Sequence, residues 1–342
     1  TLLCITKGLR DQLAIGYQTR PDIFALFTAQ AAPLYEQVVE IPERILADGT
    51  VDYPLDEEAV LVQLLEARRQ GFNSIAAVLM HSWQYPQHEQ RIGDLAAQLG
   101  FAQISLSHRI SPLIKLVPRG DTTVADAYLS PVLRHYVEQV QAELPPTDLQ
   151  FMQSHGGLCA AADFRGKDAI LSGPAGGVVG MVRTAQADGF ERLIGFDMGG
   201  TSTDVSHFSG TYERSTLTEV NGVKLRVPLM NIHTVAAGGG SIVRFADGRL
   251  QVGPESAGSY PGPACYRHGG PLTITDCNVL LGRLQPEYFP AMFGPQQNQP
   301  LDVARVRQLF AQLAAQVNEQ SGVRYTPEQL AQARRAVLKP HV

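Results

Sequence analysis

The stretch GFDMGGTSTDV, residues 195–205, decides the fold of this chain. An apolar segment over 192–196 predicts a strand that runs into Asp197, and residues 203–208 predict a returning strand. Between the two strands lies a pair of glycines, whose backbone can approach another group closely because glycine has no side chain. We therefore expect a β-hairpin with a glycine-rich tip.

The residue types in this hairpin suit a nucleotide phosphate. Phosphate oxygens need several N–H and O–H donors in a small concavity, and glycine-rich turns form such nests. The predicted donors are Gly199, Gly200, Thr201, Ser202 and Thr203. Two carboxylates, Asp197 and Asp204, would repel a polyphosphate in direct contact. They are suited instead to bind Mg²⁺ through its waters, or to act as a base on an attacking group. We assign metal binding to Asp197 and metal or base duty to Asp204. The alternative is an ordinary Asp/Gly/Thr hairpin.

A second glycine-rich segment, TVAAGGGS, covers residues 234–241. Its glycines follow an apolar strand and would allow the backbone to approach a ligand closely. On this basis we predict that the cofactor also contacts Gly238, Gly239, Gly240 and Ser241. A plain turn is the alternative.

A third segment, SGPAGGVVG, covers residues 172–180. No Gly-Lys-Ser/Thr follows, so it is not a Walker loop. Its small residues recur at successive helical turns and would let two helices pack closely, as an interdomain crossing or hinge requires. The alternative is a glycine-rich loop without a hinge role.

A rigid, aromatic loop over 253–266 is expected to be ordered and to pack on the site. Asp276 follows it and either binds a metal or has a structural role, of which we favour the structural role.

His81 and His155 are interpreted as structural histidines, since the chain has no H-x-x-x-H metal spacing. Four scattered cysteines without a C-x-x-C pair indicate reduced thiols in a cytoplasmic protein.

Length and composition set the class of protein. The 342 residues suffice for about two domains. A net charge of −5 gives no basic footprint for nucleic acid. The apolar runs stop short of the ~18 residues that a membrane span needs, and no export signal is visible. Of the 32 glycines, 23 lie in residues 151–282, so function is sought there.

The pattern of elements predicts an α/β fold with a mainly parallel sheet in the first half, since helices separate the strands. The expected helices are 56–71, 86–99 and one from Ser130-Pro131 to about 144, and the expected strands are 74–80, 102–107 and 149–153. A β-rich part to about 282 follows, then a proline-rich loop over 286–300 and two helices, the last capped by Thr326. We place a domain boundary near residue 170, which gives domains 1–170 and 171–342.

Residues 196–205 resemble the signature of the hydantoinase A/oxoprolinase family, within the actin-like ATPase superfamily. The resemblance covers nearly the whole chain. Its other motifs are similar to residues 6–11, 16–21, 42–44, 172–177, 236–241, 253–266 and 275–284. The segments that resemble the 5-oxoprolinase branch most are 78–82, 88–90, 117–120, 125–129, 293–295 and 298–300.

This resemblance implies an actin-like, ribonuclease-H-like two-domain fold with ATP in the cleft, and Mg²⁺ and K⁺ as further cofactors. The implied reaction opens a small cyclic amide, 5-oxo-L-proline, to glutamate with hydrolysis of one ATP through a phosphorylated lactam. The family's first acid-Gly-Gly-Thr hairpin is expected before Thr1 and its adenosine motif beyond the last helix, so the fold is expected to be incomplete at both ends. The segment alone should be inactive and should need the remaining segments or a second subunit, in a homo-oligomeric full-length enzyme.

Two alternatives stay open at this point. One is another enzyme of the family, an N-methylhydantoinase or an acetone carboxylase subunit. The other is a nucleotide-responsive, actin-like interaction module without lactam chemistry.

Overall fold

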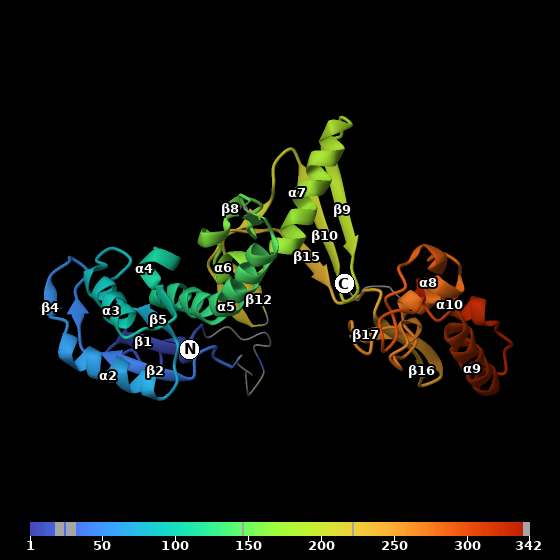
Figure 1. The fold of residues 1–342 in the computed structure, drawn as a ribbon, viewed down its shortest axis with the longest axis horizontal. Coiled ribbons are helices and arrows are strands. Elements are labelled where there is room, and N and C mark those ends of the chain that lie inside the picture. Colours follow the sequence, from blue (N-terminus) through green and yellow to red (C-terminus); the bar gives the residue numbers. More distant parts are fainter. Residues whose placement is uncertain (18–23, 25–31, 146, 221, 338–342) are drawn as a thin grey trace. The chain divides into compact units, whose positions relative to one another are not determined.

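The computed structural model describes residues 1–17, 24, 32–145, 147–220 and 222–337. Residues 18–21 of the motif over 16–21 lie outside this part. The chain divides into two compact units (Figure 1). The first unit comprises Thr1–Glu191 and Ser209–Asn231, and the second comprises Arg192–Phe208 and Ile232–Val342. The predicted domain boundary near residue 170 stays a prediction.

A four-stranded parallel sheet forms the centre of the first unit. Its order is β2-β1-β5-β6, and its strands are β1 (Leu2–Thr6), β2 (Gln37–Ile41), β5 (Ser74–Val78) and β6 (Gln103–Leu106). Strands β1 and β5 are buried along their whole length, as expected for apolar strands with helices on both faces. The prediction of a mainly parallel sheet is confirmed.

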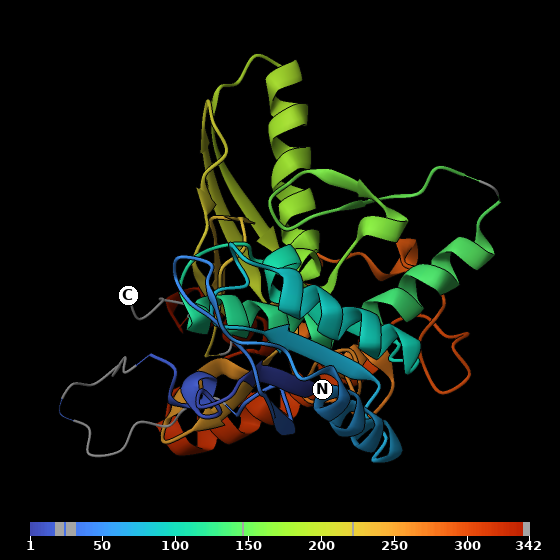
Figure 2. The same cartoon turned by 90° about the vertical axis from the view of Figure 1, so that its left-hand side faces the viewer.

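Helices cover both faces of this sheet. Leu2 and Cys4 of β1 pack in one cluster with Val60 and Leu64 of α2 (Glu57–Arg69) and with apolar residues of α3 (Gln87–Gln98). The alternate residues of β1 pack with α5 (Leu116–Glu143) on the opposite face. Figure 2 shows α5 running across the sheet on one side and α2 on the other.

Helix α5 begins earlier than predicted. The sequence placed its start at Ser130-Pro131, but the helix runs through Pro131 from Leu116 to Glu143. Proline lacks the N–H that would bond to the carbonyl of Ala127, four residues earlier. Instead, the hydroxyl of Ser74, in β5, donates to Ala127 O at 2.6 Å. A contact from a distant strand thus satisfies the carbonyl that the proline leaves unpaired.

Residues 209–231 return to the first unit. Leu225, Val227 and Leu229 pack against Ala125 of α5, and Arg226 N–H donates to Thr122 Oγ1 at 2.9 Å. The segment contains β11 (Arg214–Ser215), β12 (Thr218–Val220), β13 (Val223–Leu225) and β14 (Leu229–Met230). The other elements of this unit are α1 (Gln12–Ile15), β3 (Arg44–Ile45), β4 (Val51–Tyr53), α4 (Ser107–Ile110), β7 (Gln150–Met152), β8 (Leu158–Ala160), α6 (Gly166–Ala169) and α7 (Ser172–Ala187).

The second unit combines a small sheet with a helical core. Its three-stranded sheet has the order β15-β10-β9, with β9 (Arg192–Met198), β10 (Thr203–Ser209) and β15 (Ile232–Val235). A hairpin of β16 (Ser241–Ala246) and β17 (Arg249–Ser256) leads to α8 (Ile274–Leu280), α9 (Val303–Ser321) and α10 (Pro327–Val337). Phe310 of α9 and Cys277 of α8 are buried in one core cluster.

Local predictions on the helix ends are confirmed. Asp56 caps α2 by accepting the N–H of Ala59 at 3.0 Å. Thr326 and Gln329 exchange hydrogen bonds in the capping box of α10.

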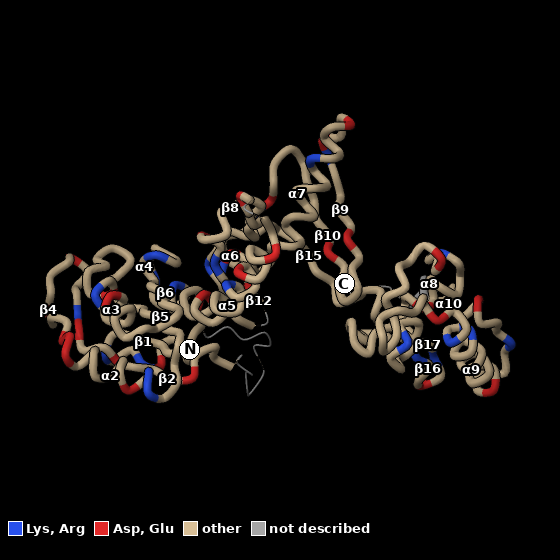
Figure 3. Tube along the Cα trace, in the orientation of Figure 1, with Lys and Arg blue, Asp and Glu red and all other residues tan. Residues whose placement is uncertain are grey.

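All four cysteines are free thiols. Within the described residues no helix has the length and apolarity to cross a bilayer. Figure 3 shows basic and acidic residues interspersed along both units.

Candidate functional site

The predicted hairpin is present in the second unit. Strands β9 and β10 are neighbours in the sheet, and Gly199 N–H donates to Ser202 O at 2.9 Å across the turn. Gly199, Gly200 and Thr201 are exposed at the tip, whereas Thr203 is buried. The tip is therefore accessible to a ligand, and the base of the turn is held by the protein.

The two carboxylates flank the turn symmetrically. Asp197 is the second-to-last residue of β9, and Asp204 is the second residue of β10. The hydroxyl of Thr234, on the paired strand β15, donates to Asp204 Oδ1 at 2.7 Å. Asp197 is exposed, and its carboxylate makes no hydrogen bond or ion pair within the described part of the chain. One carboxylate is thus oriented by the sheet and the other is available to a ligand.

The glycine segment over 234–241 packs directly on the hairpin tip. Gly239 N–H donates to Gly199 O at 2.9 Å, and Gly240 N–H donates to Gly200 O at 2.6 Å. Below the tip, Thr203 Oγ1 donates to Ala237 O at 2.5 Å. The structure therefore brings together the two segments that the sequence marked as phosphate-binding and cofactor-binding.

The close packing explains why these positions are glycines. A Cβ atom on Gly238 would lie 2.6 Å from Gly200 O, and one on Gly240 would lie 2.9 Å from the same oxygen. A Cβ on Gly239 would lie 2.8 Å from Thr275 Oγ1. The sequence predicted close approach to a ligand, and the structure places another backbone segment there. Contact of Gly238, Gly239 and Gly240 with a cofactor stays a prediction.

Ser241 stabilises this loop through hydrogen bonds to Gly238. Its side chain is buried, and its hydroxyl accepts the N–H of Gly238 at 3.0 Å. Ser241 N–H donates in turn to Gly238 O at 3.0 Å. The structure gives Ser241 a role in holding the glycine loop, and its part in cofactor binding stays a prediction.

The glycine loop is also held by Thr275, which the sequence did not assign to the site, and by Ala257 of the loop over 253–266, which was expected to pack there. Thr275 donates both its N–H and its hydroxyl to Gly239 O, at 2.8 and 2.9 Å. Ala257 N–H donates to Gly240 O at 2.8 Å. The T-I-T-D run over 273–276, a helix-capping pattern, was the available signal, because a capped helix start places the hydroxyl of Thr275 beside the loop.

Asp276 has the structural role that the sequence favoured. It is fully buried, and its Oδ2 accepts Thr273 N–H at 2.8 Å and Ala264 N–H at 3.0 Å. Its Oδ1 accepts the N–H of Cys265 at 2.9 Å. These bonds fix the end of the loop over 253–266 to the start of α8.

The donor set fits a magnesium ion bound together with a phosphate. Mg²⁺ is commonly held by one or two carboxylates plus phosphate oxygens and waters. Asp197 and Asp204 supply two carboxylates beside the tip. No group of three or more His, Cys, Asp or Glu side chains within the described residues is placed to hold a metal by itself. A Mg²⁺ ion at Asp197 would therefore complete its coordination with waters and phosphate oxygens.

The other sequence candidates lie in the first unit. His81 Nδ1 lies 2.6 Å from Ile45 O, and His155 Nε2 lies 2.8 Å from Gln153 Oε1, so both histidines are structural as expected. In α7, a Cβ on Gly173 or Gly180 would meet no described atom within 4 Å. No helix of the described part packs on these glycines, and a hinge role for 172–180 stays a prediction.

A buried polar network in the first unit was missed by the sequence. Glu89 is fully buried at the carboxyl ends of β5 and β6, and it accepts the Leu79 N–H at 3.1 Å and the Ser107 hydroxyl at 2.9 Å. Its other oxygen lies 2.9 Å from His108 Nδ1. Arg119, also buried, donates to Ser107 Oγ at 3.0 Å. Both residues lie in segments that resemble the 5-oxoprolinase branch, 88–90 and 117–120, but the sequence assigned neither of them a role.

Comparison with known proteins identifies the family of the chain. A family model described as "Hydantoinase/oxoprolinase N-terminal region" matches residues 1–100, and one described as "Hydantoinase/oxoprolinase" matches residues 119–340. The chain is 45% identical to "5-oxoprolinase 1" of Arabidopsis thaliana, over 92% of this chain and 27% of that protein. The chain thus spans about a quarter of the length of this curated relative.

Two solved structures share the fold. The ATP-dependent caprolactamase of Pseudomonas jessenii superposes with a TM-score of 0.68 at 32% identity, over 98% of this chain and 49% of that one. A nucleotide-free acetone carboxylase structure superposes with a TM-score of 0.76 at 24% identity, with the same two coverages. The predicted α/β fold of the actin-like ATPase type is confirmed.

Proposed function

The chain belongs to the hydantoinase/oxoprolinase family, and from that premise we propose that it is a segment of an enzyme that hydrolyses 5-oxo-L-proline to glutamate with the hydrolysis of ATP. The observation that carries the proposal is the exposed Gly199–Thr201 tip, flanked by Asp197 and Asp204 and supported by the glycine loop. The identity of 45% to a 5-oxoprolinase, against 38% to a caprolactamase subunit alpha, supports the choice of substrate.

The chemistry explains why such a reaction needs ATP. An unstrained lactam carbonyl is a poor electrophile. Transfer of a phosphoryl group to the lactam oxygen gives a good leaving group, so that water can attack the ring carbon and open the ring. Glutamate, ADP and phosphate are then the products. The protein has to position the phosphates and neutralise their developing charge.

The geometry narrows the set of phosphate donors. Gly199 N–H is already bonded to Ser202 O, and the Thr203 hydroxyl is bonded to Ala237 O. These two groups hold the turn in shape. Within the hairpin we therefore assign the direct phosphate contacts to Gly200, Thr201 and Ser202.

We assign Asp197 to the organisation of Mg²⁺ and Asp204 to metal or base duty. Bound Mg²⁺ would neutralise phosphate charge and orient the transferred group. The bond from Thr234 fixes Asp204 whether or not a metal is bound, whereas the unpartnered Asp197 is free to reorient toward one. K⁺ enters the proposal through the family resemblance alone.

The exposed apolar side chains of strand β9 support the proposal that the active enzyme needs more polypeptide than this chain. The strand is at the edge of its sheet, and Ile194 and Phe196, at alternate positions, are 79% and 70% exposed. Large exposed apolar side chains on an edge strand mark an interaction surface. We propose that the rest of the same enzyme, or its second subunit, covers this strand in a cytoplasmic homo-oligomer, and that the 342-residue chain alone does not turn over ATP.

The test is substrate-stimulated ATP hydrolysis by the full-length enzyme. We expect 5-oxoproline to stimulate ATP hydrolysis and to yield glutamate in equal amount, with hydantoins and acetone giving no stimulation. Stimulation by a hydantoin or by acetone in place of 5-oxoproline would assign the chain to the other enzymes of the family. ATP binding without stimulation by any of them would favour an actin-like interaction module.

A further inference from the structure

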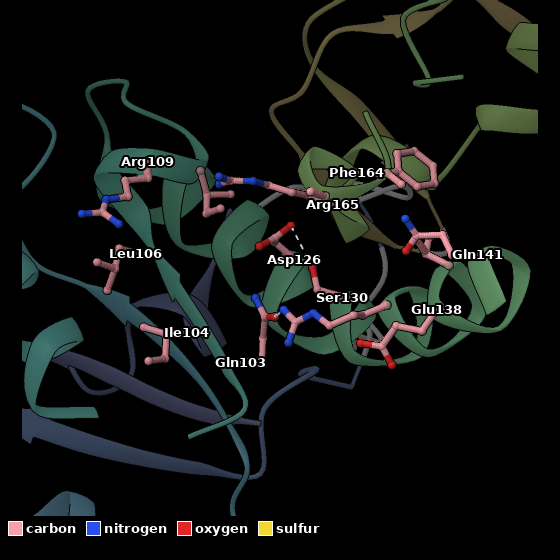
Figure 4. Close-up of a pocket in the computed structure, with 15 residues that line it drawn as sticks. Gln103, Ile104, Leu106, Arg109, Asp126, Ser130, Glu138, Gln141, Phe164 and Arg165 are labelled. Atoms are coloured by element: carbon pink, nitrogen blue, oxygen red, sulfur yellow. Dashed lines mark hydrogen bonds between the residues drawn. The ribbon is translucent and has the colours of Figure 1, made fainter. Parts of the chain in front are cut away.

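A pocket of about 440 Å³ lies in the first unit, away from every residue assigned above (Figure 4). Its volume is within the usual range of ligand sites, about 300–1,000 Å³. Edge strand β6, helices α4 and α5, and the segment over 161–165 form its walls. Four separate pieces of the chain thus converge on one cavity that the proposed reaction does not use.

The pocket carries an excess of positive charge. Three arginines line it, Arg109 from α4, Arg134 from α5 and Arg165 from the segment before α6. The lining carboxylates are Asp126 and Glu138. Asp126 is buried, and its oxygens already accept bonds from Ser105 at 2.7 Å and from Ser130 at 3.2 Å. Its charge is therefore largely satisfied by the protein. The exposed Glu138 opposes one of the three guanidinium groups, which leaves the lining with a net positive charge.

One arginine is fixed in place by a hydrogen-bonded wall. Arg134 donates to Ala102 O at 2.8 Å and to the side-chain oxygen of Gln103. Gln103 in turn donates to Ser105 Oγ at 2.9 Å, which donates to Asp126. Figure 4 shows Gln103, Asp126 and Ser130 on this wall. A guanidinium that is held on one side presents its remaining N–H groups in a fixed geometry, which lowers the entropic cost of binding.

The other two arginines have no partner of their own. The guanidinium groups of Arg109 and Arg165 make no hydrogen bond or ion pair with any residue in the described ranges. Apolar side chains, among them Ile104 and Phe164, share the lining with the polar side chains of Gln103, Ser130 and Gln141. Guanidinium groups bind carboxylates through paired N–H···O bonds, and the apolar walls accommodate a carbon skeleton.

We propose that this pocket binds a small organic carboxylate, at a site separate from the hairpin. The arginines would take the carboxylate group and the apolar walls the carbon body. An anion that lacks an apolar body, such as inorganic phosphate, would use only part of the lining. The proposal does not depend on the reaction assigned to the hairpin.

Binding is tested on the 342-residue chain, without ATP, by calorimetry and by thermal shift. The probes are L-glutamate, 5-oxoproline and glutarate, with inorganic phosphate as the comparison anion. We expect at least one carboxylate to bind saturably, more tightly than phosphate, and to raise Tm. Arg165→Gln and Arg109→Gln should each weaken that binding by about tenfold or more, because each removes a charged hydrogen-bond donor.

Arg307→Gln is the matched control, since Arg307 is exposed on α9 in the second unit and its loss changes the net charge equally. It should leave the affinity unchanged. Arg165→Lys, which keeps the charge and loses the paired N–H geometry, should give an intermediate affinity. The proposal fails if no carboxylate binds, if phosphate binds best, or if the pocket variants bind as tightly as Arg307→Gln.

Discussion

The N–H of Gly240 is bonded to the carbonyl oxygen of Gly200 at 2.6 Å, and this bond joins two glycine-rich segments that lie far apart in the sequence. A side chain at position 240 would intrude on that same oxygen, at 2.9 Å. The shape of the proposed phosphate site therefore depends on residues that are not themselves required to touch phosphate.

Replacement of these glycines should displace the hairpin tip. We expect Gly238→Ala and Gly240→Ala each to lower the free energy of unfolding by about 1–3 kcal/mol, since the added methyl overlaps backbone atoms that have little room to move. Chemical denaturation measures the effect. Gly173→Ala in α7 is the control, because its Cβ meets no described atom and alanine favours a helix. Equal stability of all three variants would show that the tip adapts freely.

Removal of the exposed carboxylate should affect turnover and leave folding intact. In the full-length enzyme, Asp197→Asn should lower kcat by about 100-fold or more, through loss of charge stabilisation at the phosphates. Its Tm should stay at the wild-type value, because the Asp197 side chain makes no hydrogen bond or ion pair within the described residues. Glu191→Gln, also exposed, is the control and should retain full activity. An unchanged kcat for Asp197→Asn would remove this residue from the mechanism.

Stability should depend on the protonation of Asp121. Burial raises the pKa of this carboxyl to about 7, and the nearby Lys224 opposes the shift. An unfolded aspartate has lost its proton above about pH 4, so between about pH 4 and pH 7 the folded state holds a proton that the unfolded state has released. The contribution of Asp121 to stability therefore falls as the pH rises through this interval.

Asp121→Asn cannot titrate and should escape this loss. The difference in Tm between Asp121→Asn and the wild type should grow in favour of the variant from pH 5 to pH 7 and then level off. Thermal denaturation across the pH range provides the measurement. Asp188→Asn, at an exposed position, should follow the wild-type curve. A constant difference at every pH would contradict the raised pKa.

The hydroxyl of Ser74 should matter only because Pro131 is present. Ser74→Ala should destabilise the first unit by about 1–3 kcal/mol, since it leaves the buried Ala127 carbonyl without a donor. In a Pro131→Ala background, the backbone N–H restored at position 131 can bond to that carbonyl, so the same substitution should cost less. A double-mutant cycle measures the coupling, and independent effects of the two substitutions would refute the compensation.

The sequence correctly predicted the turns and helix caps that depend on interactions between neighbouring residues. The turn at Gly199–Ser202, the cap at Asp56 and the capping box at Thr326 depend on neighbouring residues, so their patterns were sufficient. The start of α5 was predicted wrongly because Ser130-Pro131 has the pattern of a helix start, whereas the bond from Ser74 that accommodates Pro131 inside the helix forms only in the folded chain.

For the candidate site, the sequence likewise predicted the local segments but not the contacts between them. The glycines at 238–240 were identified as sites of close approach, but the group that approaches them is the backbone of Gly200. Likewise, the three arginines of the pocket come from separate segments, and no periodicity of one segment indicates such convergence. Contacts between distant segments are a property of the folded chain.

The discontinuous make-up of the first unit has a consequence for biosynthesis. Leu225 and Leu229 complete the packing against α5, yet they leave the ribosome after the hairpin β9–β10 has already emerged. Domains generally fold as units in the order of synthesis, but here the earlier unit has to wait for a later segment. Until Leu225, Val227 and Leu229 arrive, the face of α5 around Ala125 is open to wrong partners, so protection of the nascent chain by a chaperone would matter most before residues 209–231 have been made.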